Sequence, residues 1–250
     1  MDLIITAAQS ASIPGDISRN ITRHVRVAAM AAEHGAQLLV FPELSLIGYE
    51  LSLSRANVIR PDAAELGPLR QAAMKARMTI SAGGPWLNAE GQLHITAFVF
   101  RPDGSISIHT KQHVHQSEQH VFASGPGGPT LRVADASVAL AICADASQPS
   151  HAANAAARGA NVYAVGAMIT EDAYARKTTL LKNYALEHHM AVLLANYSGV
   201  TGGEESAGKS AIWSEDGQPV AASAGTDEAL VMGTKKNGQW TGEVIPLSLS

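Results

Sequence analysis

Cysteine is nearly absent from this sequence, because Cys143 is the only one among 250 residues. One cysteine cannot form a disulfide within the chain, and small secreted domains that depend on disulfides carry many more. The sequence therefore predicts a protein of a reducing compartment, and we expect it to be cytoplasmic.

Long apolar runs, an excess of basic charge and a signal peptide are missing as well. The apolar runs are far shorter than the roughly 20 residues that cross a bilayer, so no membrane partner is expected. The formal net charge is −4, whereas nucleic-acid-binding domains usually present a basic face. The segment after Asp2 has no basic region of the kind that opens a signal peptide. With 46% hydrophobic residues, the composition is typical of a globular chain with a large core.

Strand-like and helix-like segments alternate along the chain. Residues 3–8 form an apolar run, and Asp16 is suited to cap a helix whose apolar residues recur at helical spacing up to Ala32. Turn residues at 101–104 and 215–217 each join two strand-like runs into a hairpin. The alternation predicts an α/β fold, and since no linker interrupts it, we expect one domain over residues 1–250.

The other expected elements follow from the same periodicities and turn signals. Strands are expected at 38–41, 78–83 (ended by Gly84-Pro85), 93–100, 105–110, 131–133, 138–142, 161–165, 191–195, 207–213, 219–222 and 230–233. Helices are expected at 62–77, which Gly67-Pro68 can divide into two pieces, and at 151–158 and 171–189. Loops are expected at 48–61 and 113–128.

Three chemically active residues come directly after strand-like segments. They are Glu43, Lys111 and Cys143. If their strands are neighbours, the three side chains meet at one edge of a sheet, where α/β folds bind ligands. A thiol needs help to lose its proton near neutral pH, a carboxylate can accept that proton, and an ammonium can stabilise an oxyanion. The trio therefore predicts nucleophilic attack by sulfur on a carbonyl or nitrile carbon.

Each of the three also has a purely structural explanation. A lone cysteine at the end of a strand is more often a small core residue than a nucleophile. A glutamate after proline is often a surface residue, and a lysine leaving a hairpin is usually solvated. Position alone does not separate these explanations from catalysis.

Three motifs in the chain resemble the signatures of the carbon–nitrogen hydrolase (nitrilase) superfamily, in the same order and with matching spacing. They are LVFPEL at 39–44 with Gly48-Tyr49, then Lys111 with His113, Phe122 and Gly125, then ICAD at 142–145 with Pro149. The likeness runs from residue 4 to the hairpin near Ile212 and includes Asn196 after a late strand.

The resemblance implies a four-layer αββα sandwich in which two sheets lie between helix layers. It implies a Glu–Lys–Cys triad, with Glu43 as the base, Lys111 as the oxyanion stabiliser and Cys143 as the nucleophile of a thioester acyl-enzyme. It further suggests Glu118 as a substrate-positioning glutamate and the backbone N–H of Ala144 as a second oxyanion donor. No metal or cofactor is expected. The resemblance also implies that the protein forms a homodimer or a higher homo-oligomer.

Departures from the family pattern bear on the substrate. Ala144, Ser147 and Ser150 stand where amidase-type members often carry a bulky aromatic, an arginine and a glutamate. The Trp-Glu pair usual in true nitrilases is missing too, which favours a small linear amide over a nitrile. An N-carbamoyl hydrolase, an acyl transferase and a catalytically idle ligand- or partner-binding protein remain as alternatives.

Two competing patterns need a structural test. Residues 203–210 match the phosphate-loop pattern G-x-x-x-x-G-K-[ST], but hairpin-like sequence follows Ser210 where a phosphate loop opens a helix. Four histidines, His109, His113, His115 and His120, could suggest a metal site, but no cluster of cysteines or carboxylates accompanies them. We expect a polar loop there, and an exposed charged helix face at Arg176, Lys177 and Lys182.

Overall fold

The first half of the chain builds one sheet and its helix cover, in a computed structural model that describes residues 2–248. Strands β1 (Leu3–Gln9) and β2 (Leu38–Val40) pair in parallel and are connected by helix α1 (Ile17–Glu33). The Asp16 carboxylate accepts the Arg19 N–H, so the expected N-cap is confirmed. Strands β3 (Thr79–Leu87), β4 (Leu93–Phe100) and β5 (Ile106–Thr110) extend this sheet. Helix α2 (Gly67–Ala76) precedes β3.

The last strands return to the first sheet, which has the order β15-β14-β1-β2-β3-β4-β5. Strand β14 (Ala229–Lys236) pairs antiparallel with β1 and with β15 (Gln239–Pro246). The sequence prediction ended at residue 233 and missed β15. Most β15 side chains are exposed, so this edge strand has no continuous apolar pattern to detect.

The second sheet has the order β13-β12-β9-β8-β7-β6. Its strands are β6 (Leu131–Val133), β7 (Ala136–Ile142), β8 (Val162–Gly166), β9 (Ala191–Ala195), β12 (Ala211–Trp213) and β13 (Pro219–Ala222). Strands β7, β8 and β9 are parallel, and helices α3 (Pro149–Ala157) and α4 (Glu171–His188) connect them. A separate two-stranded ribbon, β10 (Val200–Thr201) with β11 (Glu204–Glu205), projects from the loop before β12.

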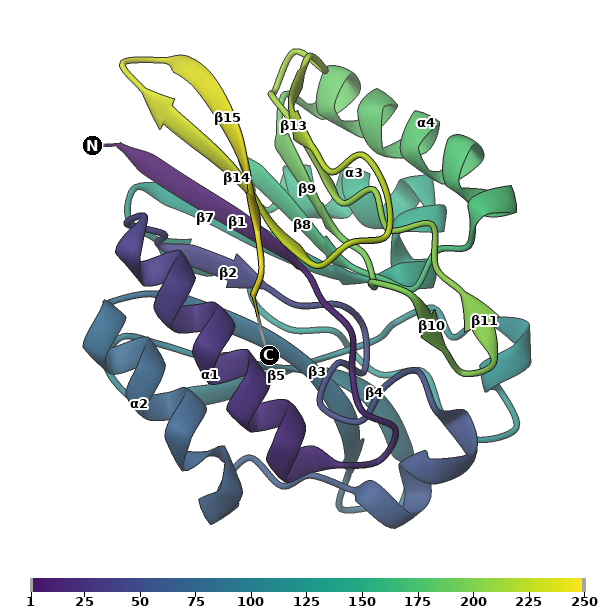
Figure 1. The fold of residues 1–250 in the computed structure, drawn as a ribbon. Helices are drawn as coiled ribbons and strands as arrows, with labels where there is room; N and C mark the ends of the chain where they lie inside the picture. The colour runs from purple at the N-terminus through teal and green to yellow at the C-terminus, as the bar shows by residue number, and fades with distance from the viewer. Residues whose placement is uncertain (1, 249–250) are drawn as a thin grey trace.

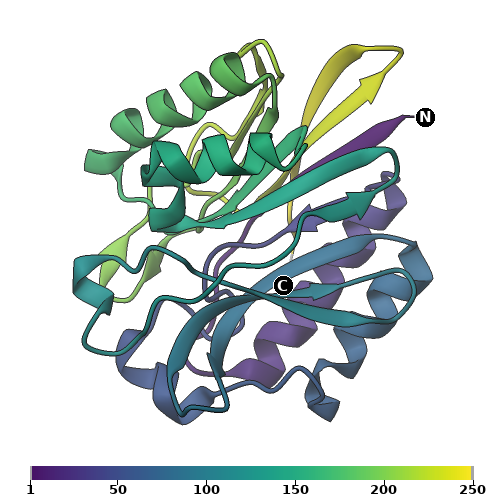
Figure 2. The same cartoon turned by 180° about the vertical axis from the view of Figure 1, so that it is seen from behind.

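The two sheets face each other between two helix layers, as Figures 1 and 2 show, with α1 and α2 outside the first sheet and α3 and α4 outside the second. The predicted αββα sandwich is confirmed. Alternation along β7 explains the layering: Val138, Leu140 and Ile142 join the cluster between the sheets, while Ala139 and Ala141 pack toward the helices. None of the helices in the described residues is long and apolar enough to cross a membrane.

Several expected boundaries were wrong. Strand β3 continues through Gly84-Pro85 to Leu87. Strand β2 pairs only with its first three residues, and beyond Ser81 that side faces a loop, where Pro85 only accepts a bond from the Ile59 N–H. The helix expected at 62–77 begins at Gly67, with proline in its first turn, after a short 3₁₀ segment η2 (Ala64–Leu66). The expected loops contain the 3₁₀ helices η1 (Leu51–Asn57) and η3 (Gln116–Glu118).

Candidate active site

Glu43 lies in a loop after β2 that is held between the two sheets. A Cβ atom at Gly83 of β3 would lie 2.2 Å from the backbone nitrogen of Leu44. One at Gly166 of β8 would lie 2.6 Å from the carbonyl oxygen of Phe41. Only glycine lets both strands approach this loop so closely. The two sheets therefore fix Glu43 from opposite sides.

Lys111, the residue after β5, is a buried cation between two buried carboxylates. Its Nζ donates to Glu43 Oε1 at 2.6 Å, and to Glu118 Oε1 at 2.8 Å and Oε2 at 2.7 Å. All three side chains are completely shielded from solvent. The structure thus brings together two of the predicted residues, Glu43 and Lys111, with Glu118 on the other side of the ammonium.

Cys143 follows β7 and is the first residue of the 3₁₀ helix η4 (Cys143–Ser147). Its φ angle of +43° is uncommon for a residue other than glycine. The Asp145 side chain accepts the backbone N–H of Ile142 at 3.1 Å, and those of Gln112 and His113 at 3.0 and 2.7 Å. Asp145 therefore ties the turn at the thiol to the segment that follows Lys111.

The three predicted catalytic residues come from two facing sheets, not from neighbouring strands of one sheet. Strands β2 and β5 belong to the first sheet and are separated by β3 and β4, whereas β7 belongs to the second. Burial raises the pKa of Glu43, and the Lys111 ammonium, followed by the Cys143 thiol, opposes part of that rise. Glu43 Oε2 has no hydrogen-bond partner among the described residues, so it can still accept a proton.

Burial controls the protonation states of the site. Burial raises the pKa of Glu43 above its ordinary value, and the Lys111 ammonium opposes part of that rise. Burial and then the Glu43 carboxylate raise the pKa of the Cys143 thiol. Burial alone would lower the pKa of Lys111, but Glu43, Cys143 and Glu118 raise it overall. Near neutral pH the site therefore holds an uncharged thiol, a lysine cation and a carboxyl group poised to exchange a proton.

The Cys143 thiol opens into a cavity of about 490 Å³. Its other walls include Tyr49, Met168 and His115, with Arg176 and Lys177 from α4. The Lys177 ammonium donates to the hydroxyl of Ser147, two residues beyond Asp145. The prediction that Lys177 lies on a solvated helix face was wrong, because the helix turns this half-buried side chain toward the cavity. Sequence periodicity gave no signal for that contact.

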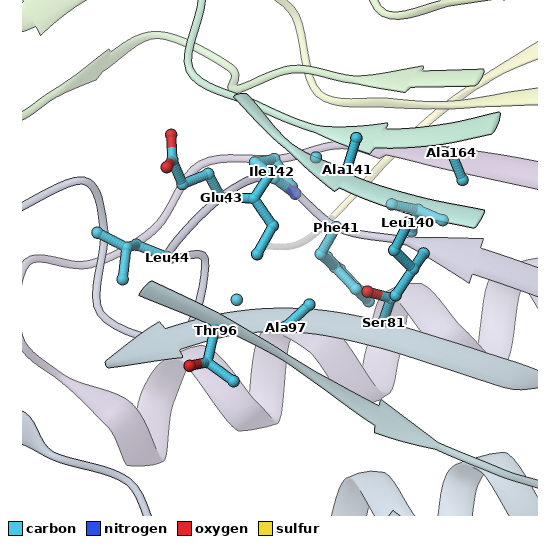
Figure 3. Close-up of a pocket in the computed structure, with 14 residues that line it drawn as sticks. Phe41, Glu43, Leu44, Ser81, Thr96, Ala97, Leu140, Ala141, Ile142 and Ala164 are labelled. Atoms are coloured by element: carbon cyan, nitrogen blue, oxygen red, sulfur yellow. The ribbon is translucent and has the colours of Figure 1, made fainter. Parts of the chain in front are cut away.

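A second space, lined by Glu43, lies between the sheets and has a volume of only about 10 Å³. Figure 3 shows Glu43 at one end of it and Leu140 and Ser81 at the other. A volume of this size holds about one water molecule. Of these two spaces, only the cavity beside Cys143 has room for a small molecule.

Glu118 and Ala144 are placed differently from each other. The Glu118 carboxylate accepts bonds from Lys111, from the Tyr49 hydroxyl at 2.7 Å and from the His115 N–H at 2.7 Å. It is not among the described residues that line the large cavity, and it contacts Lys111 and Tyr49 instead. Ala144 is in the first turn of η4, where backbone N–H groups have no partner within the helix. Tyr49, part of the first motif, was not predicted as a site residue.

The phosphate-loop match does not have a phosphate-loop structure. Ser210 is followed by strand β12 and not by a helix. The Lys209 ammonium pairs with Glu171 at 2.6 Å. Asn196 is buried and bonds to the backbone of Ile169 and Gly208, which fixes the loop after β8.

Comparison with known proteins agrees with this fold. A family model described as carbon-nitrogen hydrolase matches residues 4–236. A Pseudomonas protegens protein described as "Hydrolase in pqqF 5'region" is 30% identical over 231 residues, covering 88% of this chain and 78% of that one. An aliphatic nitrilase of Sinorhizobium fredii is 26% identical over 208 residues, covering 75% and 66%. An amidase variant from Nesterenkonia sp. AN1, solved with acrylamide added at its active-site cysteine, superposes with a TM-score of 0.83 at 27% identity, covering 92% of both chains.

This chain belongs to the carbon–nitrogen hydrolase family. The match spans nearly its whole length, and the structural likeness is to an amidase of the same fold. The chain is accordingly an enzyme of the carbon–nitrogen hydrolase class.

Proposed function

We propose that this enzyme hydrolyses the C–N bond of small linear amides through a thioester on Cys143. The observation that carries the proposal is the buried contact of Lys111 with Glu43, beside a thiol that faces a cavity of about 490 Å³. A cavity of this volume suits a small molecule. The similar Nesterenkonia protein is an amidase, and its active-site cysteine reacts with acrylamide.

In the acylation step, Cys143 Sγ attacks the amide carbon and its proton passes to Glu43. The oxyanion that forms is stabilised by the Lys111 ammonium and by the N–H of Ala144. Lys111 makes two of its three bonds to one carboxylate, Glu118, so one proton can turn toward the oxyanion. The tetrahedral intermediate then collapses, the C–N bond breaks, and the proton from Glu43 leaves with the nitrogen as ammonia.

In the deacylation step, water attacks the thioester carbon while Glu43 accepts one of its protons. The C–S bond breaks, the carboxylic acid leaves, and the proton returns to the sulfur. Glu43 therefore serves as a base in both steps and as an acid in between. Glu118 orients Lys111 and Tyr49 during both steps.

The test measures ammonia release from acetamide, propionamide and butyramide, together with the intact mass of the protein during turnover. We expect ammonia from wild type and an acyl adduct on the protein, and neither from Cys143→Ala. Glu43→Gln should slow acylation or deacylation by about 10² to 10⁴. Normal turnover by Cys143→Ala would exclude the mechanism, and no turnover of any amide by wild type would favour a catalytically idle protein. Acyl transfer is separated by adding hydroxylamine and measuring the hydroxamate.

A second candidate substrate class is the N-carbamoyl amino acids. The arginine that amidase-type relatives often carry is replaced by Ser147, but Lys177 brings an ammonium to the same place. That cation could bind a substrate carboxylate. N-Carbamoyl amino acids belong in the substrate panel, with Lys177→Met expected to raise KM for them alone. Lys182→Met, exposed on the same helix, is the matched control.

A further inference from the structure

Three buried side chains meet behind the turn that carries Cys143. They are His109 from β5, Asp145 from η4 and His151 from α3. Each offers one ligand atom, and the three atoms lie within 4.8 Å of one another. We propose that these residues form a binding site for one divalent transition metal ion of the zinc type.

The histidines have ring nitrogens without partners. Neither ring nitrogen of His109 has a hydrogen-bond partner among the described residues, although the side chain is 4% exposed. Nε2 of His151 has no partner either, and that residue is 3% exposed. Buried polar atoms nearly always have a partner, so several such nitrogens beside one carboxylate indicate a ligand.

The hydrogen bonds around the cluster leave lone pairs facing one another. Asp145 Oδ1 accepts the backbone N–H groups of Gln112 and His113 and lies 3.1 Å from His113 Nδ1. Asp145 Oδ2 accepts only the N–H of Ile142. Asp145 Oδ2 lies 4.0 Å from His151 Nε2, which is too far for a hydrogen bond. Nδ1 of His151 lies 2.8 Å from the Tyr163 hydroxyl. When Nδ1 donates to that oxygen, Nε2 presents its lone pair toward Asp145.

The donor set suits zinc, nickel or cobalt. Two imidazole nitrogens and one carboxylate oxygen are ordinary ligands of Zn²⁺, with water in the fourth position. Atoms within 4.8 Å of one another lie at most about 2.8 Å from a common centre, so metal–ligand bonds of about 2.1 Å require shifts of up to about 0.7 Å each. The His109 ring can turn without breaking a hydrogen bond.

The site has no local sequence pattern, because His109 is far along the chain from Asp145 and His151 and belongs to the other sheet. His109 was grouped with the loop histidines, of which His115 and His120 are exposed. The carboxylate comes from Asp145 in η4, after β7, and the second imidazole comes from His151 in helix α3. The site also goes beyond the proposed amide hydrolysis, since none of its three residues takes part in that reaction.

The test begins with protein dialysed against 1,10-phenanthroline and then titrated with Co²⁺ or Zn²⁺. We expect saturable binding of one equivalent, the visible absorption of four-coordinate Co²⁺ and a higher Tm with Zn²⁺. Cys143→Ser should bind with unchanged affinity, which excludes the catalytic thiol as a ligand. His109→Phe should weaken binding by more than about tenfold, and Tyr163→Phe by roughly 10- to 100-fold. His120→Ala is the matched control and should bind like wild type.

Equal affinity in wild type and His109→Phe, or no saturable binding in wild type, would overturn the proposal. A crystal of the wild-type protein grown with Zn²⁺ provides a second test, which does not depend on whether any variant folds. Diffraction at the zinc absorption edge should show an anomalous peak between the three side chains. Electron density between the three side chains without an anomalous signal would mean that a buried water molecule bridges them. That result would contradict the metal site.

Discussion

The Glu43 carboxyl group sets the acid side of the pH profile. It accepts a proton only when ionised, and burial raises its pKa above the ordinary value of 4.5. As the pH falls through that raised pKa, the base is lost, so kcat/KM should fall at a pH well above 4.5. The measurement is kcat/KM for a neutral amide across the pH range in which the protein stays folded. An acid limb at or below 4.5 would contradict the assignment.

Lys111 is the residue on which the stability of the site depends. Its removal in Lys111→Met leaves Glu43 and Glu118 buried and close together without a counter-charge. Breaking a buried ion pair in this way costs about 3–5 kcal/mol, so denaturant unfolding should show a large loss of stability. The double variant Lys111→Met with Glu118→Gln should recover part of it. Equal stability of the single and double variants would mean that the carboxylates do not repel each other.

The candidate residues that follow strands could be predicted from the sequence, whereas contacts made by the packing of separate elements could not. Glu43, Lys111 and Cys143 could be proposed because each comes after a strand in a recognisable motif. The contact of Lys177 with Ser147 spans 30 residues, and His109 lies near Asp145 and His151 although it belongs to the other sheet. Neither contact has a local pattern, because the packing of α4 and the docking of the two sheets create them.

The loop that carries Glu43 depends on two glycines in separate sheets. In Gly166→Ala, the added Cβ would lie 2.6 Å from the Phe41 carbonyl oxygen and push the loop away. A displacement of about 1 Å at a catalytic group can reduce the rate by about 10². We expect that loss in kcat for Gly166→Ala, with a stability cost of about 1–3 kcal/mol.

Gly67→Ala is the control for that substitution. Gly67 has a helical φ of −49°, and a Cβ there meets nothing within 4 Å. Its activity and stability should match wild type or exceed it slightly. Full activity in Gly166→Ala would show that the loop can shift without moving Glu43.

The helices and strands were predicted best where apolar residues recur along the sequence at a clear helical or strand spacing. Strands β7, β8 and β9 and helix α4 lie within a few residues of the expected ranges. Strand β15 was not predicted because most of its side chains are exposed. Strand β3 was predicted to end before a proline, but proline is tolerated there because no strand pairs with that side of β3. Local sequence does not report which side of a strand is paired.

The whole chain is predicted to unfold as one unit and to associate with copies of itself. A single domain over residues 1–250 should show one thermal unfolding transition in calorimetry. Its calorimetric and van't Hoff enthalpies should be equal when both are expressed per mole of the unit that unfolds cooperatively. Light scattering on the purified protein should give the mass of at least two chains. Two resolved transitions would contradict the single domain, and a single-chain mass at working concentration would contradict the oligomer.

The origin of the site in two sheets has a consequence for biosynthesis. Glu43 and Lys111 are synthesised before Cys143, and the first sheet is completed only by β14 and β15 near the end of the chain. Until the sheets dock, the thiol has neither its proton acceptor nor its cation. Refolding should therefore restore helix and strand content before it restores reactivity toward a thiol reagent. If Cys143 is the proposed nucleophile, its thiol becomes activated only after the chain has left the ribosome and the two sheets have docked.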